Sequence, residues 1–263
     1  MTVVPFVDSH VQKVICGTGG HMYRSLVGRL SEYPIPTLRF QPESPRERLL
    51  DIGCNWGRWV VAASRQGFRP VGIDRSLSAV NAARRVAAQL GAAAHFVVAD
   101  ARHLPFRSGS IDATFSYSVL QHMEKSDARL AMREASRVLR SGGRAVVQMP
   151  NGLGLRSLYH QARRSFRRAR GNEVRYWHPA ELRQAFEADI GPSTLSVDGY
   201  LSLNAQPTDR HLLPRRFRWV VDVSEALRQI SGRVRWLADL ADSLYVTSRK
   251  TPASPTDHAH RLL

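Results

Sequence analysis

The sequence predicts an α/β protein with a doubly wound, mostly parallel sheet that carries helices on both faces. After Pro45, short apolar runs alternate with stretches whose apolar residues have helical spacing. Glycines follow the first of these runs and end the first two helical stretches. Strands separated by helices of about 10–15 residues form βαβ units, in which each crossover helix covers one face of a parallel sheet.

The elements between residues 48 and 150 follow one another in a regular order. The first strand ends in a glycine turn, and Ser76 is positioned to cap a long alanine-rich helix that ends before Gly91. We expect strands over 49–53, 70–74, 95–98, 111–118 and 145–149, and helices over 58–66, 76–90 and 126–140.

The flanking segments are less regular. Residues 1–47 are rich in glycine and proline and are expected to hold one short helix, over 22–30. Two prolines and the absence of apolar periodicity predict a flexible tail over 251–263. In the C-terminal part we expect helices over 179–188 and 215–241, the second broken near Gly232, and strands over 195–203 and 243–248.

The composition is that of a globular protein. With 43% hydrophobic and 23% charged residues, the 263-residue chain is not disordered as a whole. No run approaches the roughly 18 apolar residues of a transmembrane helix, and residues 1–5 lack the features of a secretory signal. Cys16 and Cys54 are too few for a disulfide framework or a four-cysteine metal site. We therefore expect a soluble cytoplasmic protein without a metal.

The net charge of +16 is high, with 38 basic against 22 acidic residues. Only Lys13, Lys125 and Lys250 are lysines, and an arginine excess of this kind indicates a habit of codon usage more than a binding face. One run stands out, over 163–170, where five of the eight residues are arginines. We interpret it as the exposed face of a helix, with phosphate or anion binding as the alternative.

Three polar features follow three consecutive strands of the expected sheet. The segment 51–57 contains Gly53 and Gly57 and opens a helix, so backbone N–H groups can approach a ligand. Asp74 and Asp100 end the next two strands, where carboxylates can accept hydrogen bonds from ribose hydroxyls and an adenine amine. A dinucleotide is disfavoured, because Asn55 and Val60 replace glycines of the pyrophosphate-binding motif.

These segments resemble the motifs of the class I S-adenosylmethionine-dependent methyltransferases. Residues 49–57 resemble the first motif of that family, and 71–76 and 99–106 resemble its ribose- and adenine-binding segments. Residues 111–122 and 137–144 are similar to the segments around its fourth and fifth strands, so the resemblance covers about 48–150, with weaker similarity in 176–182 and in the final strand. The departure is Asn55, where many members have glycine.

The resemblance implies a seven-stranded, Rossmann-like sheet with an antiparallel last strand and a helical insertion before it. It implies S-adenosylmethionine as cofactor. Gly53, Cys54 and Gly57 would lie against its methionine part, within a motif that begins at Asp51. The remaining contacts would come from Asp74 (ribose), Arg75 (adenine face), Asp100 and Ala101 (adenine edge), and Ser116 or Tyr117 (sulfonium).

The domain organisation follows from the same reading. The extension 1–47 would form part of the cover over substrate and cofactor. The methyltransferase domain would span 48–250, with a cofactor half over 48–150 and substrate-side segments over 151–178 and 204–242. We expect the acceptor pocket to be built from 17–30, 152–178 and 204–240, because insertions of this size often serve as lids.

An oxygen acceptor that holds a proton needs a base. His122, just after the fourth strand, is the first candidate, and His103 and His178 are weaker ones. The sequence thus predicts a small-molecule methyltransferase, directed at oxygen, that acts on a biosynthetic intermediate such as a glycan or a secondary metabolite. An RNA (tRNA) methyltransferase and a non-catalytic scaffold remain as alternatives.

Overall fold

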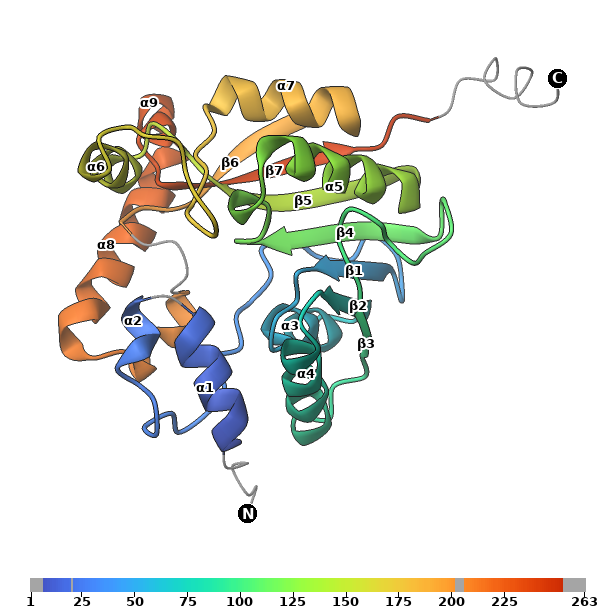
Figure 1. The fold of residues 1–263 in the computed structure, drawn as a ribbon, viewed down its shortest axis with the longest axis horizontal. Helices are drawn as coiled ribbons and strands as arrows, with labels where there is room; N and C mark the ends of the chain where they lie inside the picture. The colour runs from blue at the N-terminus through green and yellow to red at the C-terminus, as the bar shows by residue number, and fades with distance from the viewer. Residues whose placement is uncertain (1–6, 20, 202–205, 253–263) are drawn as a thin grey trace, which may run out of the picture.

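The computed structural model describes all residues except 1–6, 20, 202–205 and 253–263. It contains a seven-stranded sheet in the order β3-β2-β1-β4-β5-β7-β6 (Figure 1). Its strands are β1 (Arg48–Ile52), β2 (Arg69–Asp74), β3 (His95–Val98), β4 (Ile111–Tyr117), β5 (Leu139–Pro150), β6 (Ser193–Gly199) and β7 (Ser243–Arg249).

The strand directions are those implied by the resemblance. Strands β3, β2, β1, β4 and β5 are mutually parallel, and β7 is antiparallel to both of its neighbours, β5 and β6. The order reverses between β1 and β4, because the chain first builds outward to β3 and then returns to the other side of β1. Ligands of such sheets bind beyond the carboxyl ends of the strands at this switch point.

Helices cover both faces of the sheet (Figure 1). The helices are α1 (Ser9–Thr18), α2 (His21–Arg24), α3 (Arg58–Arg65), α4 (Leu77–Gln89), α5 (Lys125–Val138), α6 (Leu155–Arg163), α7 (Pro179–Asp189), α8 (Arg215–Ser231) and α9 (Arg235–Asp239), with short 3-10 helices η1 (Leu120–His122) and η2 (Pro207–Leu212). Successive strand residues point to opposite faces, so Leu50 lies in a hydrophobic cluster with residues of α5 and α7, whereas Leu49 lies in one with residues of α3.

The N-terminal segment differs from the sequence prediction. In place of one helix over 22–30, it forms α1 and the short α2, followed by turns. Asp8 caps α1 by accepting hydrogen bonds from the backbone N–H groups of His10 and Val11. Val11 and Ile15 lie one turn apart on its buried face and pack with α4. This pairing outweighs the glycines that predicted an irregular segment.

The C-terminal half departs from the prediction at three places. Strand β6 ends at Gly199, and residues 202–205, predicted as its end and the loop after it, lie outside the described residues. Helix α6 and the short η2 are additional. The arginine run is not helical beyond Arg163, because Ser165 and Phe166 both adopt the left-handed conformation, with φ of 52° and 53°. The tail predicted over 251–263 lies outside the described residues from 253 on.

Candidate functional site

A cavity of about 760 Å³ lies beyond the carboxyl ends of β1, β2 and β4, at the switch point of the sheet. Its walls come from the strand ends, the segment after β4, the end of α1 and the loop after α6. Of the predicted site residues, those that line it are Gly53, Cys54, Asp74, Arg75, Asp100, Ala101, Tyr117 and His122.

The turn after β1 has a backbone that few residues tolerate. Gly53 has a φ of 79°, and a Cβ atom there would lie 2.3 Å from Val119 Cγ2, so only glycine fits. Asn55 has a φ of 49°, in the left-handed region that asparagine enters more readily than most residues. This explains how asparagine stands where many members of the resembled family have glycine.

Asp74 joins this turn to the next element. Its Oδ2 accepts a hydrogen bond from the backbone N–H of Asn55 at 3.0 Å, and its Oδ1 accepts one from that of Ser76 at 2.9 Å. Each carboxylate oxygen has a second lone pair, so the side chain keeps acceptor capacity for a ligand in the cavity. The strand end and the helix start thus fix one carboxylate at the cavity wall.

Asp100 is held by a neighbouring guanidinium. Arg102 donates from its backbone N–H and Nε to Oδ1 and from Nη2 to Oδ2, at 2.8–3.0 Å. The hydrogen bonds from the Arg102 side chain lower the pKa of Asp100 to about 2. The group is therefore an ionised acceptor at neutral pH, and Oδ2 retains one lone pair for a further donor.

Three predicted residues do not line the cavity. Gly57 begins α3 with a φ of 82°. Ser116 is buried and donates its hydroxyl hydrogen bond to the Ile52 carbonyl at 3.0 Å. Asp51 is 1% exposed, and burial, together with the negative charge of Asp74, raises its pKa to about 8. All three residues are buried, so they support the fold around the cavity and do not face it.

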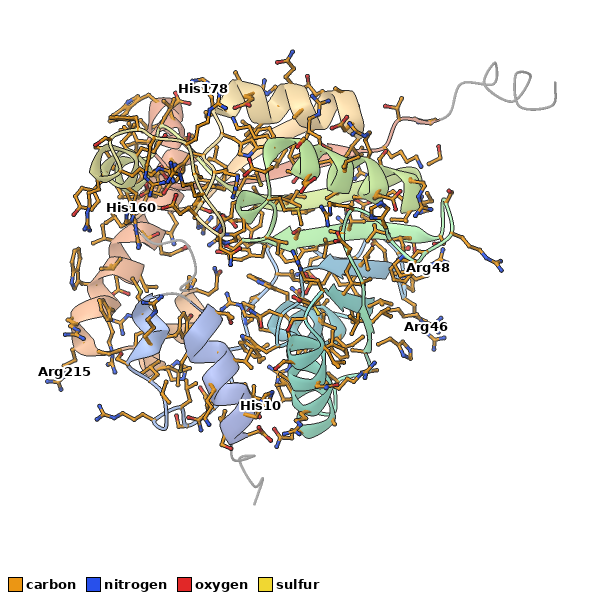
Figure 2. The ribbon with its side chains drawn as sticks, viewed as in Figure 1. His10, Arg46, Arg48, His160, His178 and Arg215 are labelled. Carbon is orange, nitrogen blue, oxygen red and sulfur yellow. The ribbon has the colours of Figure 1, made fainter. Side chains whose placement is uncertain are left out.

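His122 lies at the cavity, and its two ring nitrogens have different partners. Nδ1 lies 2.8 Å from the Asn172 carbonyl, which can only accept, so Nδ1 carries the proton. Nε2 then holds the lone pair, 3.2 Å from Gln121 Nε2. Of the weaker candidates, His103 does not line the cavity, and His178 caps α7 by accepting from the Ala180 N–H (Figure 2).

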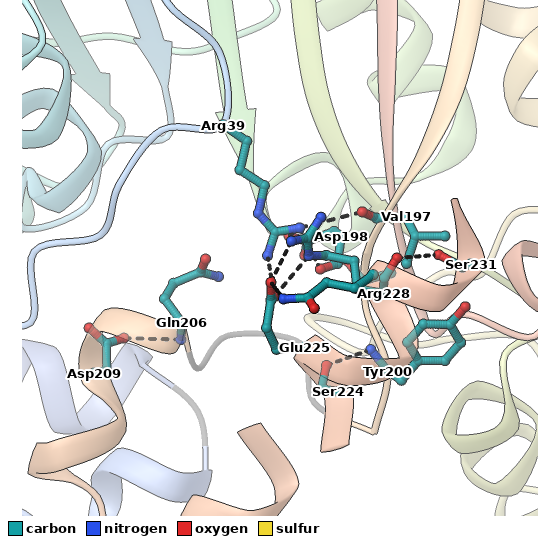
Figure 3. Close-up of polar contacts among 12 residues, drawn as sticks. Arg39, Val197, Asp198, Tyr200, Gln206, Asp209, Ser224, Glu225, Arg228 and Ser231 are labelled. Atoms are coloured by element: carbon teal, nitrogen blue, oxygen red, sulfur yellow. Dashed lines mark hydrogen bonds and ion pairs between the residues drawn. The ribbon is translucent and has the colours of Figure 1, made fainter. Parts of the chain in front are cut away.

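Tyr117 separates this cavity from a smaller one of about 10 Å³. Its hydroxyl donates to Asp198 Oδ2 and accepts from Gln206 Nε2, both at 2.9 Å, and burial raises its pKa. Figure 3 shows Arg39 and Arg228 pointing toward Glu225. Arg39 and Glu225 line this smaller cavity. The Tyr117 hydroxyl is thus fixed in a polar network that reaches from β4 to β6 and the insertion before β7.

The sequence prediction missed several cavity residues. Two of the segments expected to cover the site contribute cavity residues that were not predicted individually: Gly17–Gly19, and Asn172 and Arg175 in the loop after α6. Arg58 directly follows Gly57, is 9% exposed, and lies 3.9 Å from Asp209 of η2. Its position next to the glycine motif was the signal that could have identified it. No described residue of 204–240 lines the larger cavity, whereas Gln206, Pro207, Val221, Ser224 and Glu225 line the smaller one. Helix α8 packs beside α1 and α2, and the contribution of 204–240 to an acceptor pocket stays a prediction.

Within the described residues, no three His, Cys, Asp or Glu side chains gather in a way that could hold a metal ion. In the same part of the chain, no helix is both long and apolar enough to cross a membrane.

Residues 49–143 match the family model of a methyltransferase domain. The mouse tRNA (carboxymethyluridine(34)-5-O)-methyltransferase ALKBH8 is 29% identical over 161 residues, which cover 59% of this chain and 22% of that protein. The O-methyltransferase resE of Aspergillus sclerotiorum is 33% identical over 108 residues, 40% of each chain. The chain therefore spans less than half the length of these curated relatives.

Solved structures share the architecture. A chain from the complex of the Haloferax volcanii Trm112 methyltransferase activator with a methyltransferase superposes with a TM-score of 0.57 at 17% identity, over 94% of this chain and 95% of that one. At this identity the likeness concerns the fold. The glycine turn and the two strand-end carboxylates lie within the matched segment, so residues 49–143 of this chain match a methyltransferase domain and have the fold of the class I, S-adenosylmethionine-dependent methyltransferases.

Proposed function

We propose that this chain transfers a methyl group from S-adenosylmethionine to an oxygen of a small-molecule acceptor, such as a glycan or secondary-metabolite intermediate. The observation that carries the proposal is the single cavity that joins the glycine turn and Asp74 to the Tyr117–His122 side of the switch point. Its volume of about 760 Å³ lies in the upper part of the range of about 300–1,000 Å³ for ligand sites, which supports room for an acceptor beside a cofactor.

The cofactor side of the cavity offers acceptors that match a nucleoside with an amino-acid tail. Asp74 and Asp100 keep free lone pairs for ribose and adenine donors, respectively. Asn55 Oδ1 is buried without a hydrogen-bond partner among the described residues, so it is available to an ammonium group. S-adenosylmethionine, when bound, supplies a methyl group whose leaving group is a neutral sulfide.

The acceptor side is formed by the segment after β4 and the loop 171–175. Arg175 donates from Nη1 to the carbonyls of His122, Gly171 and Glu173, so it holds this loop against the segment that carries His122. A fixed wall of this kind orients an acceptor and excludes water from the reacting atoms, which is the main demand of a methyl transfer.

His122 is the proposed base. Its Nε2 holds a lone pair, and the Asn172 carbonyl fixes the ring tautomer through Nδ1. An acceptor hydroxyl that displaces the Gln121 amide from Nε2 would hand its proton to the ring as the oxygen attacks. The O-methyltransferase relative supports an oxygen acceptor.

Incubation of the purified chain with isotope-labelled S-adenosylmethionine and a metabolite extract, followed by mass spectrometry, tests the proposal. A labelled small molecule that gains one methyl group is expected. Failure of S-adenosylmethionine to bind would instead leave the non-catalytic scaffold.

The resemblance to a tRNA methyltransferase and the net charge of +16 favour RNA as the second candidate acceptor. A parallel incubation with total tRNA separates the two, because labelled nucleosides would appear only for an RNA enzyme. The affinity for tRNA should also fall steeply with salt in that case, since phosphate contacts release counterions. Labelling of tRNA without labelled metabolites would replace the first proposal by the second.

A further inference from the structure

Helix α6 presents its apolar side to solvent. Leu155, Leu158, Tyr159 and Ala162 follow the spacing of one helical face, and the first three are 55%, 40% and 57% exposed. A surface helix of a globular protein normally turns such a face toward the core. We name these four residues the α6 face.

The opposite side of α6 is polar and is bound to the protein. Ser157 is 2% exposed, and its N–H donates to Asp242 Oδ1 at 3.0 Å. Gln161 Nε2 donates to the Gly152 carbonyl at 2.9 Å, and Arg156 Nη1 donates to the Leu201 carbonyl at 2.9 Å. The helix is therefore fixed by polar contacts, and the α6 face contributes little to the folded core.

The segment after α6 adds an exposed ring and a group of arginines. The Phe166 side chain is 68% exposed, within the run of five arginines that ends at Arg170. Glu173 is the only acidic residue over 153–177, and it pairs with Arg167 at 2.7 Å. Within the described residues, neither Arg163 nor Arg168 forms an ion pair, so much of this positive charge is available to a partner.

We propose that the α6 face and the following loop dock this protein on an anionic lipid bilayer. Leucine side chains and an exposed phenylalanine enter the boundary between head groups and acyl chains, while arginines remain at the level of the phosphates. Basic residues beside an apolar helix face are complementary to anionic lipid, both in charge and in polarity. Nucleic acid would use the arginines but gives leucine side chains no partner.

The location of this surface adds a consequence for access to the site. The loop that carries Phe166 continues directly to Gly171, Asn172 and Arg175, which line the larger cavity. Figure 1 shows α6 at one side of the molecule, beside α9. Docking through the α6 face would therefore place the rim of the cavity close to the bilayer surface.

Co-sedimentation of the full chain with vesicles tests the proposal. The probes are vesicles of phosphatidylcholine alone and vesicles in which some of the phosphatidylcholine is replaced by the anionic lipid phosphatidylglycerol. The double variant Leu155→Ser/Leu158→Ser removes aliphatic contacts, and Leu77→Ser/Leu130→Ser is its control, because Leu77 and Leu130 are 60% and 39% exposed on α4 and α5. For charge, Arg163→Gln/Arg168→Gln is compared with Arg65→Gln/Arg107→Gln, and circular dichroism verifies that each variant is folded.

We expect the wild-type chain to bind the anionic vesicles and not the phosphatidylcholine vesicles. The leucine double variant should weaken this binding by about tenfold or more, and each arginine removed from the loop should weaken it by roughly fivefold. Both control variants should bind as the wild type does. Absence of wild-type binding at low salt would overturn the proposal, as would equal losses in the control variants. Retention of binding in the leucine variant would also overturn it, because charge alone would then explain the affinity. If the leucine pair instead converted a dimer into a monomer in light scattering, without vesicle binding, the face would be an interface between two copies of this chain.

Discussion

The Asp74 carboxylate serves the fold and the proposed cofactor site through different lone pairs. It accepts from the N–H groups of Asn55 and Ser76 and also lines the cavity. We expect Asp74→Ala to weaken S-adenosylmethionine binding by about 1–3 kcal/mol, which is about 5- to 150-fold, because it removes charge-assisted hydrogen bonds. Titration calorimetry measures the change. Glu124→Ala is the control, since Glu124 lines the same cavity but pairs with Arg175 on the acceptor side; equal losses in both variants would contradict the assignment.

Replacement of His122 is expected to lower the rate of methyl transfer without changing the affinity for the cofactor. Among the described residues, the ring nitrogens hydrogen-bond to the Asn172 carbonyl and the Gln121 side chain, neither of which belongs to the glycine turn, so we expect removal of the ring to leave that turn intact. His122→Ala should lower kcat by about 10²–10⁴-fold if it acts as the base. His103→Ala, outside the cavity, should leave kcat unchanged. Undiminished turnover in His122→Ala would remove this residue from the mechanism.

Asp51 predicts a pH dependence of stability. Its pKa of about 8 in the folded protein lies above the ordinary value of 3.8, so the folded state keeps a proton that the unfolded chain releases. The free energy of unfolding should therefore fall as pH rises from about 4 to 8, by up to about 1.4 kcal/mol per pH unit. Asp51→Asn should flatten this slope in urea denaturation, whereas the exposed Asp222→Asn should retain it. A slope unchanged in Asp51→Asn would show that another group causes it.

At the level of elements, the cofactor half was the more predictable part. Strands β1 to β4 and helices α3 to α5 lie within two residues of their predicted bounds, because each has its own periodicity and a capping signal such as Ser76. The last strand was predicted correctly, as was the break between α8 and α9.

The elements that were missed depend on contacts between distant segments. Helix α1 is buried against α4 through Val11 and Ile15, which a glycine-rich local sequence does not indicate. Helix α6 is held to the protein by polar contacts of Ser157 and Gln161 on its inner side. Its apolar residues face outward, so their spacing does not mark a face that packs on the core. Arg58 was not predicted as a site residue, because its neighbours Tyr23 and Asp209 come from two other segments of the chain.

That three-residue cluster joins the N-terminal helices to the insertion before β7. The Tyr23 hydroxyl donates to the Asp209 carboxylate, and both side chains are buried. Tyr23→Phe leaves a buried carboxylate without one donor, so we expect the free energy of unfolding to fall by about 1–3 kcal/mol. Urea denaturation measures it, and Tyr159→Phe, at an exposed tyrosine, is the control. Equal stability of the two variants would indicate that the Tyr23–Asp209 contact contributes nothing to the joining of these elements.

At the scale of the whole molecule, the cavity joins parts of the chain that are far apart in sequence. Its walls include Gly17–Gly19, the strand ends and the loop 171–175, so a ligand that fills it contacts segments that come together only in the folded state. A ligand of this kind stabilises the folded protein by mass action, by about 2.7 kcal/mol at a concentration one hundred times its Kd. For a chain of this size we expect S-adenosylmethionine or S-adenosylhomocysteine to raise the Tm by roughly 5–10 °C.

Hydrogen exchange locates that stabilisation. If the ligand spans the cavity, amides of α1 and of the loop 171–175 should exchange more slowly together with those after β1, although about 150 residues separate the first two. Amides of α7, which covers the sheet away from the cavity, should exchange at nearly their original rate. Protection confined to the segments after β1 and β2 would mean that the cofactor leaves the rest of the cavity open, and an acceptor added next should then protect α1 and the loop 171–175.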